Sequence, residues 1–394
     1  MYTMTRIIAA FDSFKGSLTS REAGEAFRRG FMAERPDAEV EVLAIADGGE
    51  GMAEAISEGV GGVMVSKQVC DPLGRRVEAH YALINEGDTA VIAMSSASGL
   101  TMLSPDERNP LIASTYGTGE LIVDALERGC SKIIMGLGGS ATNDCGVGML
   151  RALGYRFYDS TGEELTETIS ILERVESIST AQRNPLLMGV RFTAAVDVDN
   201  PLYGPMGAAH IFAPQKGASP EVVERLDRAL RHYAEVVGKE SAEVAGAGAA
   251  GGMGYALHTM LGARMCPGIE IVLTLLDFER RAEGAALVVT GEGSIDAQTL
   301  HGKAPAGVLR AAQRLSIPVV ALGGRVEGIE ELLAGGFREV HAITPFGQLT
   351  GVAMQRATAI ENMERTARAI AHVLMDGVPT TASEMDRSLI KLGM

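Results

Sequence analysis

The stretch from Lys132 to Asp144 constrains the fold most strongly. An apolar, strand-like run, Lys132–Gly136, breaks into glycines and then into hydroxyl, amide and carboxylate side chains, and a helix-like segment that ends near Gly154 follows. That order places backbone amides and small polar groups at the start of a helix, where an anion is stabilised. The stretch therefore predicts a cradle for a phosphate or a carboxylate. A plain strand-to-helix turn is the alternative, because glycines serve both.

The size and charge of the chain narrow its class. With 394 residues, of which 46% are hydrophobic, it can bury more than one core, so we expect two domains. A net charge of -15 argues against nucleic acid or an anionic membrane as the main partner. The four cysteines form no C-x-x-C pair, and there is no signal-like start and no apolar run of membrane-spanning length. These features predict a cytoplasmic protein without a membrane partner.

The two ends of the chain share one pattern of strand, polar loop and helix. Near the N-terminus, strand-like runs end in the loops Asp12–Ser17 and Asp47–Gly51, and Thr19 with Glu22 forms a capping box between them. From residue 285 the pattern returns, with predicted strands at Leu287–Thr290, Pro318–Leu322 and Val340–Ile343, and helices at Pro305–Leu315 and Thr358–Met375. About five strands with helical crossovers are enough for one doubly wound sheet.

The middle of the chain has a different character. Residues 63–94 alternate short β-rich runs with turn signals, as in antiparallel hairpins, and a helix at Thr118–Glu127, a strand at Arg191–Val196 and a helix capped by Ser219 follow. We therefore predict an α/β protein of two domains. A discontinuous doubly wound, Rossmann- or flavodoxin-like domain with a parallel sheet comprises residues 1–65 and 283–394, and residues 66–282 form an inserted mixed α/β domain.

Several well-known motifs are missing or out of context. The tract Gly246–Gly251 matches G-x-G-x-x-G, but it follows a helix and a polar segment instead of a strand, which argues against a dinucleotide fingerprint. There is no Walker A loop, H-E-x-x-H or G-x-S-x-G motif. His210, His258 and His301 lie near polar loops without ligand spacing, and we expect them to serve packing or the surface.

What remains is a set of glycine-rich polar loops that carry acids and lysines. Lys15 lies at a helix start, and Lys216 and Lys303 lie beside glycines, so each could hold a phosphate or a carboxylate, with a surface role as the alternative. The acids of these loops could bind Mg²⁺ or take a hydroxyl proton, although singly each could be a cap or turn residue: Asp47, Asp144, Asp197, Asp199 and Asp296.

Taken together, these loops resemble the type I glycerate kinase family over nearly the whole chain. The residues that carry the resemblance are Asp12–Ser17, Ala46–Gly51, Asp71–Gly74, Arg108–Pro110, Gly117–Glu120, Gly138–Asp144, Asp199–Leu202, Pro214–Ala218, Gly248–Gly252, Gly291–Gly293, Ile295–Thr299 and Gly302–Pro305. The resemblance implies ATP-dependent phosphorylation of D-glycerate, with Mg²⁺, in two α/β domains with the active site in the cleft between them. It implies 2-phosphoglycerate as the usual product.

On this basis we assign candidate residues. Lys15 and Lys303 would neutralise phosphate or carboxylate, while Asp197 or Asp296 would orient and deprotonate the glycerate hydroxyl and bind the metal. Further contacts to substrate or phosphate are expected from Asp12, Ser13, Gly16, Ser17, Asp47, Gly48, Gly49, Glu50, Gly138, Gly139, Ser140, Thr142, Asn143, Asp144, Asn200, Lys216, Gly291, Glu292, Gly293 and Gln298. We expect a monomer or a homodimer.

The chain departs from the family pattern at three positions. Family members tend to have Gly at Cys145, Arg at Ser294 and Glu at Ala93, and the missing cation at Ser294 bears on how an anion is held there. A kinase that forms 3-phosphoglycerate, or one that acts on another small hydroxy acid, is the nearest alternative. A nicotinamide-dependent hydroxy-acid dehydrogenase and a non-catalytic sugar-acid sensor are more distant ones.

Overall fold

The computed structural model describes residues 5–375, which divide into two compact units. Unit 1 joins the N-terminal part up to Asp47 with the part from Val272 onward, and unit 2 is Gly48–Ile271. The predicted boundaries near residues 65 and 283 differ from these limits. Helix α2 (Met52–Val60) falls in unit 2, because it packs against strands of that unit, β4 and β5. None of the helices between residues 5 and 375 combines the length and apolar character that a membrane crossing needs.

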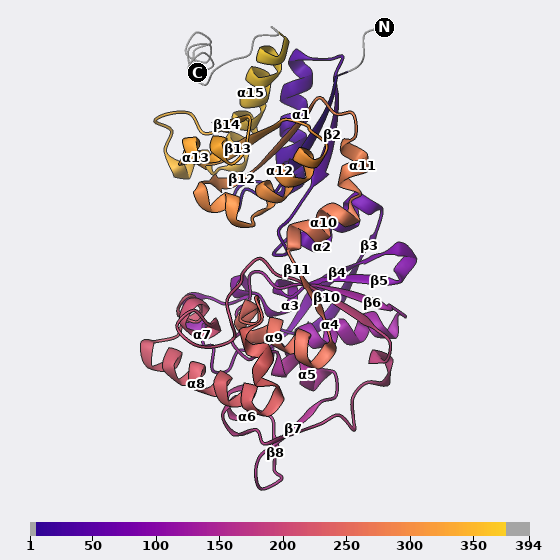
Figure 1. The fold of residues 1–394 in the computed structure, drawn as a ribbon, viewed down its shortest axis with the longest axis vertical. Helices are drawn as coiled ribbons and strands as arrows, with labels where there is room; N and C mark the ends of the chain where they lie inside the picture. Colours follow the sequence, from indigo (N-terminus) through magenta and orange to yellow (C-terminus); the bar gives the residue numbers. More distant parts are fainter. Residues whose placement is uncertain (1–4, 376–394) are drawn as a thin grey trace. The chain divides into compact units, whose positions relative to one another are not determined.

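Unit 1 contains the predicted doubly wound sheet (Figure 1). Its five strands are all parallel and lie in the order β14-β13-β12-β1-β2. The strands are β1 (Arg6–Phe11), β2 (Glu39–Ala44), β12 (Leu287–Ile295), β13 (Val319–Val326) and β14 (Glu339–Ala342). The helices are α1 (Ser20–Glu34), α11 (Phe278–Ala282), α12 (Ala304–Arg314), α13 (Ile329–Ala334), α14 (Thr350–Ala353) and α15 (Arg356–Met375), and α10 (Gly268–Leu275) spans the division between the units.

This strand order is that of flavodoxin-like folds, in which the chain reverses direction across the sheet between its first and third strands. Here the reversal lies between β1 and β12. Successive residues of β1 point to opposite faces of the sheet, and all of Ile7–Phe11 are buried, because helices cover both faces. Ile7, Ala9 and Phe11 join one core with α1 and α15, which lie side by side in Figure 1, while α12 packs on β1, β12 and β13.

Local sequence signals explain how α1 begins and how closely it packs. The Thr19 side chain accepts a hydrogen bond from the backbone of Glu22, and the Glu22 carboxylate accepts one from the backbone of Thr19, so the predicted capping box is confirmed. Gly30 of α1 faces α15 so closely that a Cβ atom there would lie 2.2 Å from the Glu364 carbonyl oxygen. Only glycine allows the two helices this approach.

Two of the predicted strands are longer than expected. The sequence predicts that strands end at Thr290 and Leu322, before glycine-rich loops, but β12 and β13 continue and pair as far as Ile295 with Val326. The glycines permit this pairing, because a Cβ at Gly291 would lie 2.0 Å from the Leu322 carbonyl oxygen. Gly291, Glu292 and Gly293 therefore belong to a strand and not to a loop.

Unit 2 is built on a six-stranded mixed sheet in the order β11-β10-β6-β5-β4-β3. The first four strands are parallel, and β3 and β4 are joined as the predicted antiparallel hairpin. The strands are β3 (Val63–Cys70), β4 (Arg76–Ile84), β5 (Thr89–Ala93), β6 (Lys132–Gly136), β10 (Arg191–Ala195) and β11 (Arg264–Cys266); β7 (Arg156–Tyr158), β8 (Glu164–Leu165) and β9 (Ser177–Ser179) form a small antiparallel sheet.

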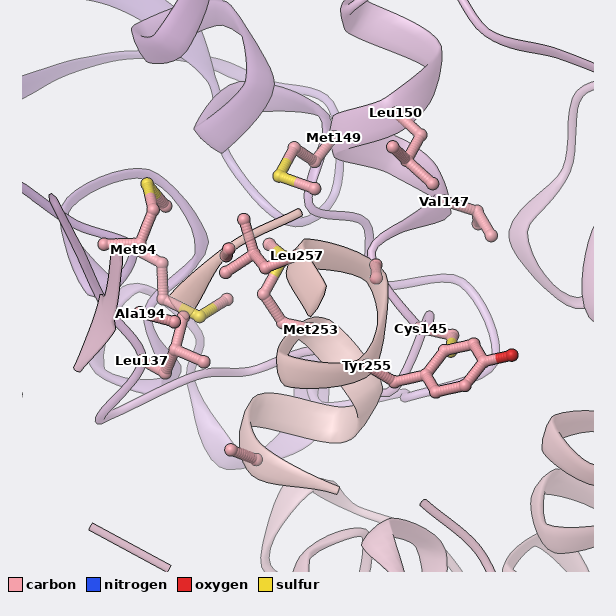
Figure 2. Close-up of a cluster of buried hydrophobic side chains, with 14 of the residues drawn as sticks. Met94, Leu137, Cys145, Val147, Met149, Leu150, Ala194, Met253, Tyr255 and Leu257 are labelled. Carbon is pink, nitrogen blue, oxygen red and sulfur yellow. The ribbon is translucent and has the colours of Figure 1, made fainter. Parts of the chain in front are cut away.

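Helices surround this sheet and enclose a second core. They are α2, α3 (Ser95–Ser98), α4 (Tyr116–Glu127), α5 (Val147–Ala152), α6 (Thr168–Arg174), α7 (Ala208–Phe212), α8 (Pro220–Val237) and α9 (Ala249–Leu261). Figure 2 shows part of the core, with Met149 of α5 beside Met253 and Leu257 of α9. Met149 and Met253 therefore fill space in this core, whereas other methionines, such as Met188 and Met206, are exposed. All four cysteines are free thiols.

Candidate functional site

A cavity of about 730 Å³ opens at the carboxyl edge of the sheet of unit 1, where the strand order reverses between β1 and β12. This volume is in the usual range for small-molecule sites, and the carboxyl edge at a reversal of strand order is where open α/β sheets bind ligands. We call it the switch-point pocket. The candidate residues that line it are Asp12, Ser13, Lys15, Ser17, Asp47, Glu292, Gly293 and Lys303.

The lining of the pocket differs between the β2, β1 and β12 part of the sheet edge and the β13 and β14 part. Strand β12 supplies Glu292, and the segments that follow β1, β2 and β12 supply the other two carboxylates and two lysines of the pocket. Strands β13 and β14 and the segments that follow them supply Arg325 and otherwise mostly apolar or hydroxyl side chains: Val326, Ala342, Ile343, Thr344, Thr350, Ala353, Met354 and Ala359. The pocket therefore offers a charged half and a largely apolar half to one ligand.

Asp12 is the most perturbed acid of the pocket. It follows β1, is buried, and accepts a hydrogen bond from the backbone amide of Ser13. Burial, together with the negative charges of Asp47 and Glu292, raises its pKa to about 7, and the nearby Lys15 opposes this shift only weakly. The carboxylates of this half repel one another, so a cation or a hydrogen-bond donor in the pocket would stabilise them.

Glu292 and Lys303 form a pair that joins β12 to the start of α12. The Glu292 Oε1 atom accepts a hydrogen bond from Thr299 Oγ1 at 2.9 Å and lies 3.3 Å from Lys303 Nζ. Burial raises the pKa of Glu292, although the charge of Lys303 opposes the shift. Lys303 is the N-cap residue of α12, so its ammonium and the positive end of that helix both lie at the pocket.

Ser294 of β12 lies beside an arginine of the neighbouring strand. Ser294 lines the pocket and pairs with Arg325 across β12 and β13. Arg325 also lines the pocket, and its guanidinium pairs with Glu327. The sequence analysis missed Arg325, although its place just after Gly323-Gly324, in the region where a strand was expected to end, was a usable signal.

The other candidates of unit 1 lie outside the lining of the pocket. Asp296 caps the short 3-10 helix Ala297–His301, where its Oδ1 accepts a hydrogen bond from the backbone amide of Gln298 at 2.9 Å. Gly16 lies in a tight turn with φ +76°, next to Met354. Gly291 accepts a hydrogen bond from the backbone amide of Asp12 and so helps to place that acid.

Unit 2 holds the remaining candidates, and several of them serve its own packing. A Cβ at Gly138 would lie 2.6 Å from Gly49 Cα, so these glycines allow two loops to touch. Asn200 Nδ2 donates to the Met206 carbonyl oxygen, and Asp197 Oδ1 accepts from the amide of Gly268. The others in this unit are Gly48, Glu50, Gly139, Ser140, Thr142, Asn143, Asp144 and Lys216.

Asp144 is predicted to contact a ligand, but the structure uses it internally. The residue is fully buried, and its carboxylate accepts hydrogen bonds from Thr115 Oγ1 and from the amides of Thr115, Gly146 and Gly148. Thr115 and Gly146 are the N-cap residues of α4 and α5. Asp144 therefore ties the starts of two helices together, and no oxygen is left exposed for a ligand.

Cys145 follows in a left-handed conformation, with φ 50°. Glycine adopts this conformation without strain, which explains the family preference for glycine at this position. Figure 2 shows the cysteine beside Tyr255, and burial raises the pKa of its thiol well above the ordinary range. Cys145 is therefore a packing residue and not a reactive thiol.

Lys216 is the most unusual cation of unit 2. It is only 2% exposed, and its ammonium donates to Ser140 Oγ at 2.8 Å and to the Thr142 carbonyl oxygen at 2.6 Å. Burial lowers its pKa to about 7, against a smaller opposing effect of Asp144.

Within residues 5–375, no group of three or more His, Cys, Asp or Glu side chains is arranged to hold a metal ion.

The chain is similar to known proteins over nearly its full length. The model of the glycerate kinase family matches residues 7–375. A Bacillus subtilis protein named glycerate kinase is 43% identical over 371 residues, covering 93% of this chain and 97% of that protein. An Escherichia coli protein named glycerate 2-kinase is 44% identical over 323 residues, covering 81% and 85%. A crystal structure from Salmonella typhimurium LT2, described with the name glycerate kinase 2, has a TM-score of 0.84 at 42% identity and covers 95% of this chain and 99% of that one.

Proposed function

Because the chain belongs to the glycerate kinase family, we propose that it transfers the terminal phosphoryl group of ATP to the 2-hydroxyl of D-glycerate. The product is then 2-phospho-D-glycerate. The position of transfer is supported by the name of the Escherichia coli relative, which specifies a 2-kinase. Phosphoryl transfer needs positioning and neutralisation of charge, and it needs no covalent intermediate on the protein.

The observation that carries this proposal is the two-sided switch-point pocket of unit 1. A nucleotide has a flat, weakly polar base at one end and a polyanion at the other. The base would lie against Val326, Ile343 and Met354, and the phosphates would lie toward the segments that follow β1 and β12. A cavity of about 730 Å³ is large enough for a ligand of this size.

Lys15 and Lys303 would neutralise the phosphates. Lys15 lies in the loop that follows β1, and Lys303 begins α12, so both reach the same pocket from neighbouring strands. The charge of the transferred group is spread over its equatorial oxygens in the transition state, where a fixed ammonium is most effective. These two residues are therefore proposed as catalytic residues.

Mg²⁺ is part of the proposal, and the structure bears on how it would be held. Asp197 lies in unit 2 and Asp296 in unit 1, so neither unit contains both acids. The carboxylate of each accepts a hydrogen bond from a backbone amide. Mg²⁺ in kinases is bound by one or two carboxylates together with substrate phosphates. We propose that one or two of the pocket carboxylates, among Asp12, Asp47 and Glu292, would bind the ion together with the phosphates. When bound, the ion would neutralise phosphate charge.

The residue that takes the hydroxyl proton is proposed to be Asp197 or Asp296. Asp197 is exposed at the end of β10, where polar side chains follow the parallel strands of unit 2. Replacing the residue that takes the proton, Asp197→Asn or Asp296→Asn, should lower kcat by at least about a hundredfold while the far-UV circular dichroism spectrum stays unchanged. Near-normal kcat removes that residue from the mechanism.

A coupled assay of ADP release with D-glycerate tests the function. We expect ADP release that requires both ATP and D-glycerate. A nicotinamide-dependent dehydrogenase would instead reduce NAD with D-glycerate, and the tract Gly246–Gly251 offers it little, since the 3-10 helix Lys239–Glu243 and not a strand precedes it. A sensor would bind D-glycerate without consuming ATP.

A cytoplasmic location and a monomeric or homodimeric state remain predictions for this protein.

A further inference from the structure

The surroundings of Lys216 in unit 2 point to a ligand. Lysine is rarely buried unless an acid pairs with it. Lys216 is almost completely buried, yet no ion pair among the described residues includes it. The nearby Asp144 directs its carboxylate oxygens to Thr115, Gly146 and Gly148 instead. The ammonium thus lacks a direct anionic partner within residues 5–375.

The same loop buries further polar groups without partners. Thr142 Oγ1 and both Asn143 side-chain atoms, Nδ2 and Oδ1, make no hydrogen bond within residues 5–375, and both residues are 0% exposed. Leaving such a group unpaired is destabilising, so native proteins rarely do so several times in one loop. The Thr142 carbonyl oxygen and the Ser140 hydroxyl both accept hydrogen bonds from Lys216, and Asn143 follows Thr142 directly in the same loop. We call Ser140, Thr142, Asn143 and Lys216 the Lys216 cluster.

The chemistry of the cluster matches a small hydroxy acid. Lys216 Nζ and Asn143 Nδ2 donate hydrogen bonds, as a carboxylate requires, and Asn143 Oδ1 accepts one, as a hydroxyl requires. A triphosphate fits poorly, because the cluster has a single cation and a buried Asp144 close to it. The switch-point pocket, in contrast, has two lysines and room for a nucleotide.

We propose that the Lys216 cluster binds the carboxylate and the 2-hydroxyl of the acceptor acid. The inference rests on the proposed function for the identity of the acid, D-glycerate. It assigns the acid to unit 2 and leaves the nucleotide to the pocket of unit 1. The sequence analysis could not separate these two roles.

The loop of the cluster is held firmly by its neighbours. The Ala141 amide donates a hydrogen bond to the Ser98 carbonyl oxygen, and Gly99 and Ser140 form an isolated antiparallel β-bridge. Gly251 lies so close that a Cβ there would be 2.2 Å from the Thr142 carbonyl oxygen. A loop fixed on several sides loses little conformational entropy when a ligand binds, which favours specific recognition of a small molecule.

Calorimetric titration with D-glycerate in the absence of ATP tests the inference. Lys216→Met keeps the length of the side chain but removes its charge, and we expect the Kd for D-glycerate to rise at least about tenfold. The matched control is Lys239→Met, which changes an exposed lysine of the same unit and should leave this Kd unchanged. The Kd for ATP, titrated separately, should stay within about twofold in both variants.

A second variant keeps the test decisive if Lys216→Met does not fold. Asn143→Ala should remove the recognition of the 2-hydroxyl, so the preference of the protein for D-glycerate over 3-hydroxypropionate, which lacks that hydroxyl, should fall at least about fivefold. A folded Lys216→Met variant with unchanged Kd for D-glycerate overturns the inference. So does an Asn143→Ala variant with unchanged preference, or a loss of affinity for ATP or inorganic phosphate instead of the acid.

The outcome is separable from that of the proposed function. If the wild-type protein phosphorylates D-glycerate but its affinity for the acid does not depend on Lys216, the inference fails and the function stands. If the protein binds small 2-hydroxy acids through Lys216 but releases no ADP with D-glycerate, the cluster stands and the proposed function fails.

Discussion

Replacing Asp144 should destabilise unit 2 more than any change at an exposed acid. In Asp144→Ala, the buried amides of Thr115, Gly146 and Gly148 and the hydroxyl of Thr115 lose an acceptor that lies between 2.7 and 3.2 Å away. A buried donor left unpaired costs about 1–3 kcal/mol, and losses at one residue add incompletely. We therefore expect the free energy of unfolding to fall by about 3–5 kcal/mol.

Urea unfolding followed by far-UV circular dichroism measures this loss, since the chain contains no Trp. Hydrogen exchange should also accelerate in residues 115–152, where α4 and α5 begin. Asp144→Asn keeps one acceptor oxygen and should lose about half as much. The matched control is Asp88→Ala, because the half-exposed carboxylate of Asp88 pairs with Lys132 at the surface and should contribute little to the free energy of unfolding. A loss below about 1 kcal/mol in Asp144→Ala would refute the reasoning.

Three other perturbations give distinct results. Lys15→Met and Lys303→Met should each lower kcat/KM for ATP by about a hundredfold or more in the coupled assay, whereas Lys132→Met should not; full activity in either would contradict its role at the phosphates. Cys145→Gly relieves a left-handed conformation at φ 50° and should raise or preserve the melting temperature, so a clear drop would show that the buried thiol contributes more than the strain costs. Burial lowers the pKa of Lys216 from 10.5 to about 7, so between these values the unfolded chain holds more protons and the free energy of unfolding should rise with pH, by up to about 1.4 kcal/mol per unit. That slope should disappear in Lys216→Met, and an unchanged slope would assign it to another group.

The architecture of unit 1 could be predicted because its signals are local. The capping box of Thr19 and Glu22 marks the start of α1, and apolar runs that end in polar loops mark the strands of a parallel sheet. The order of the strands is not a local property. Only the structure shows that β1 lies between β2 and β12, and this order sets the position of the switch-point pocket.

The glycines were the main source of error in the strand limits. Gly291 and Gly323 interrupt apolar runs, which predicts loops, but both lie inside strands, where they relieve contacts with neighbouring backbone. A glycine that serves close packing and one that serves a ligand loop look the same in a single sequence. Gly138 is a further case, because it makes room for Gly49.

The candidate site could be predicted only in part, because the sequence does not show which side chains tertiary structure brings together. Candidate residues of β12 and of the segments that follow β1, β2 and β12 line the pocket, among them Lys15 and Glu292. The apolar wall from Ile343 and Met354 was missed, because its residues are ordinary core-like side chains until tertiary structure brings them to the pocket. Burial of Asp144 was equally invisible, since an acid after a glycine loop has the same sequence pattern whether it faces a ligand or caps a helix.

Phosphorus NMR of the reaction of ATP with D-glycerate tests the central claim most directly. We expect a new phosphate ester whose signal is split by one neighbouring proton, because the carbon that carries the 2-hydroxyl of glycerate bears a single hydrogen. A signal split by two protons would place the phosphate on the 3-hydroxyl and contradict the proposed product. An unchanged ATP spectrum in the presence of D-glycerate and Mg²⁺ would contradict the kinase activity itself.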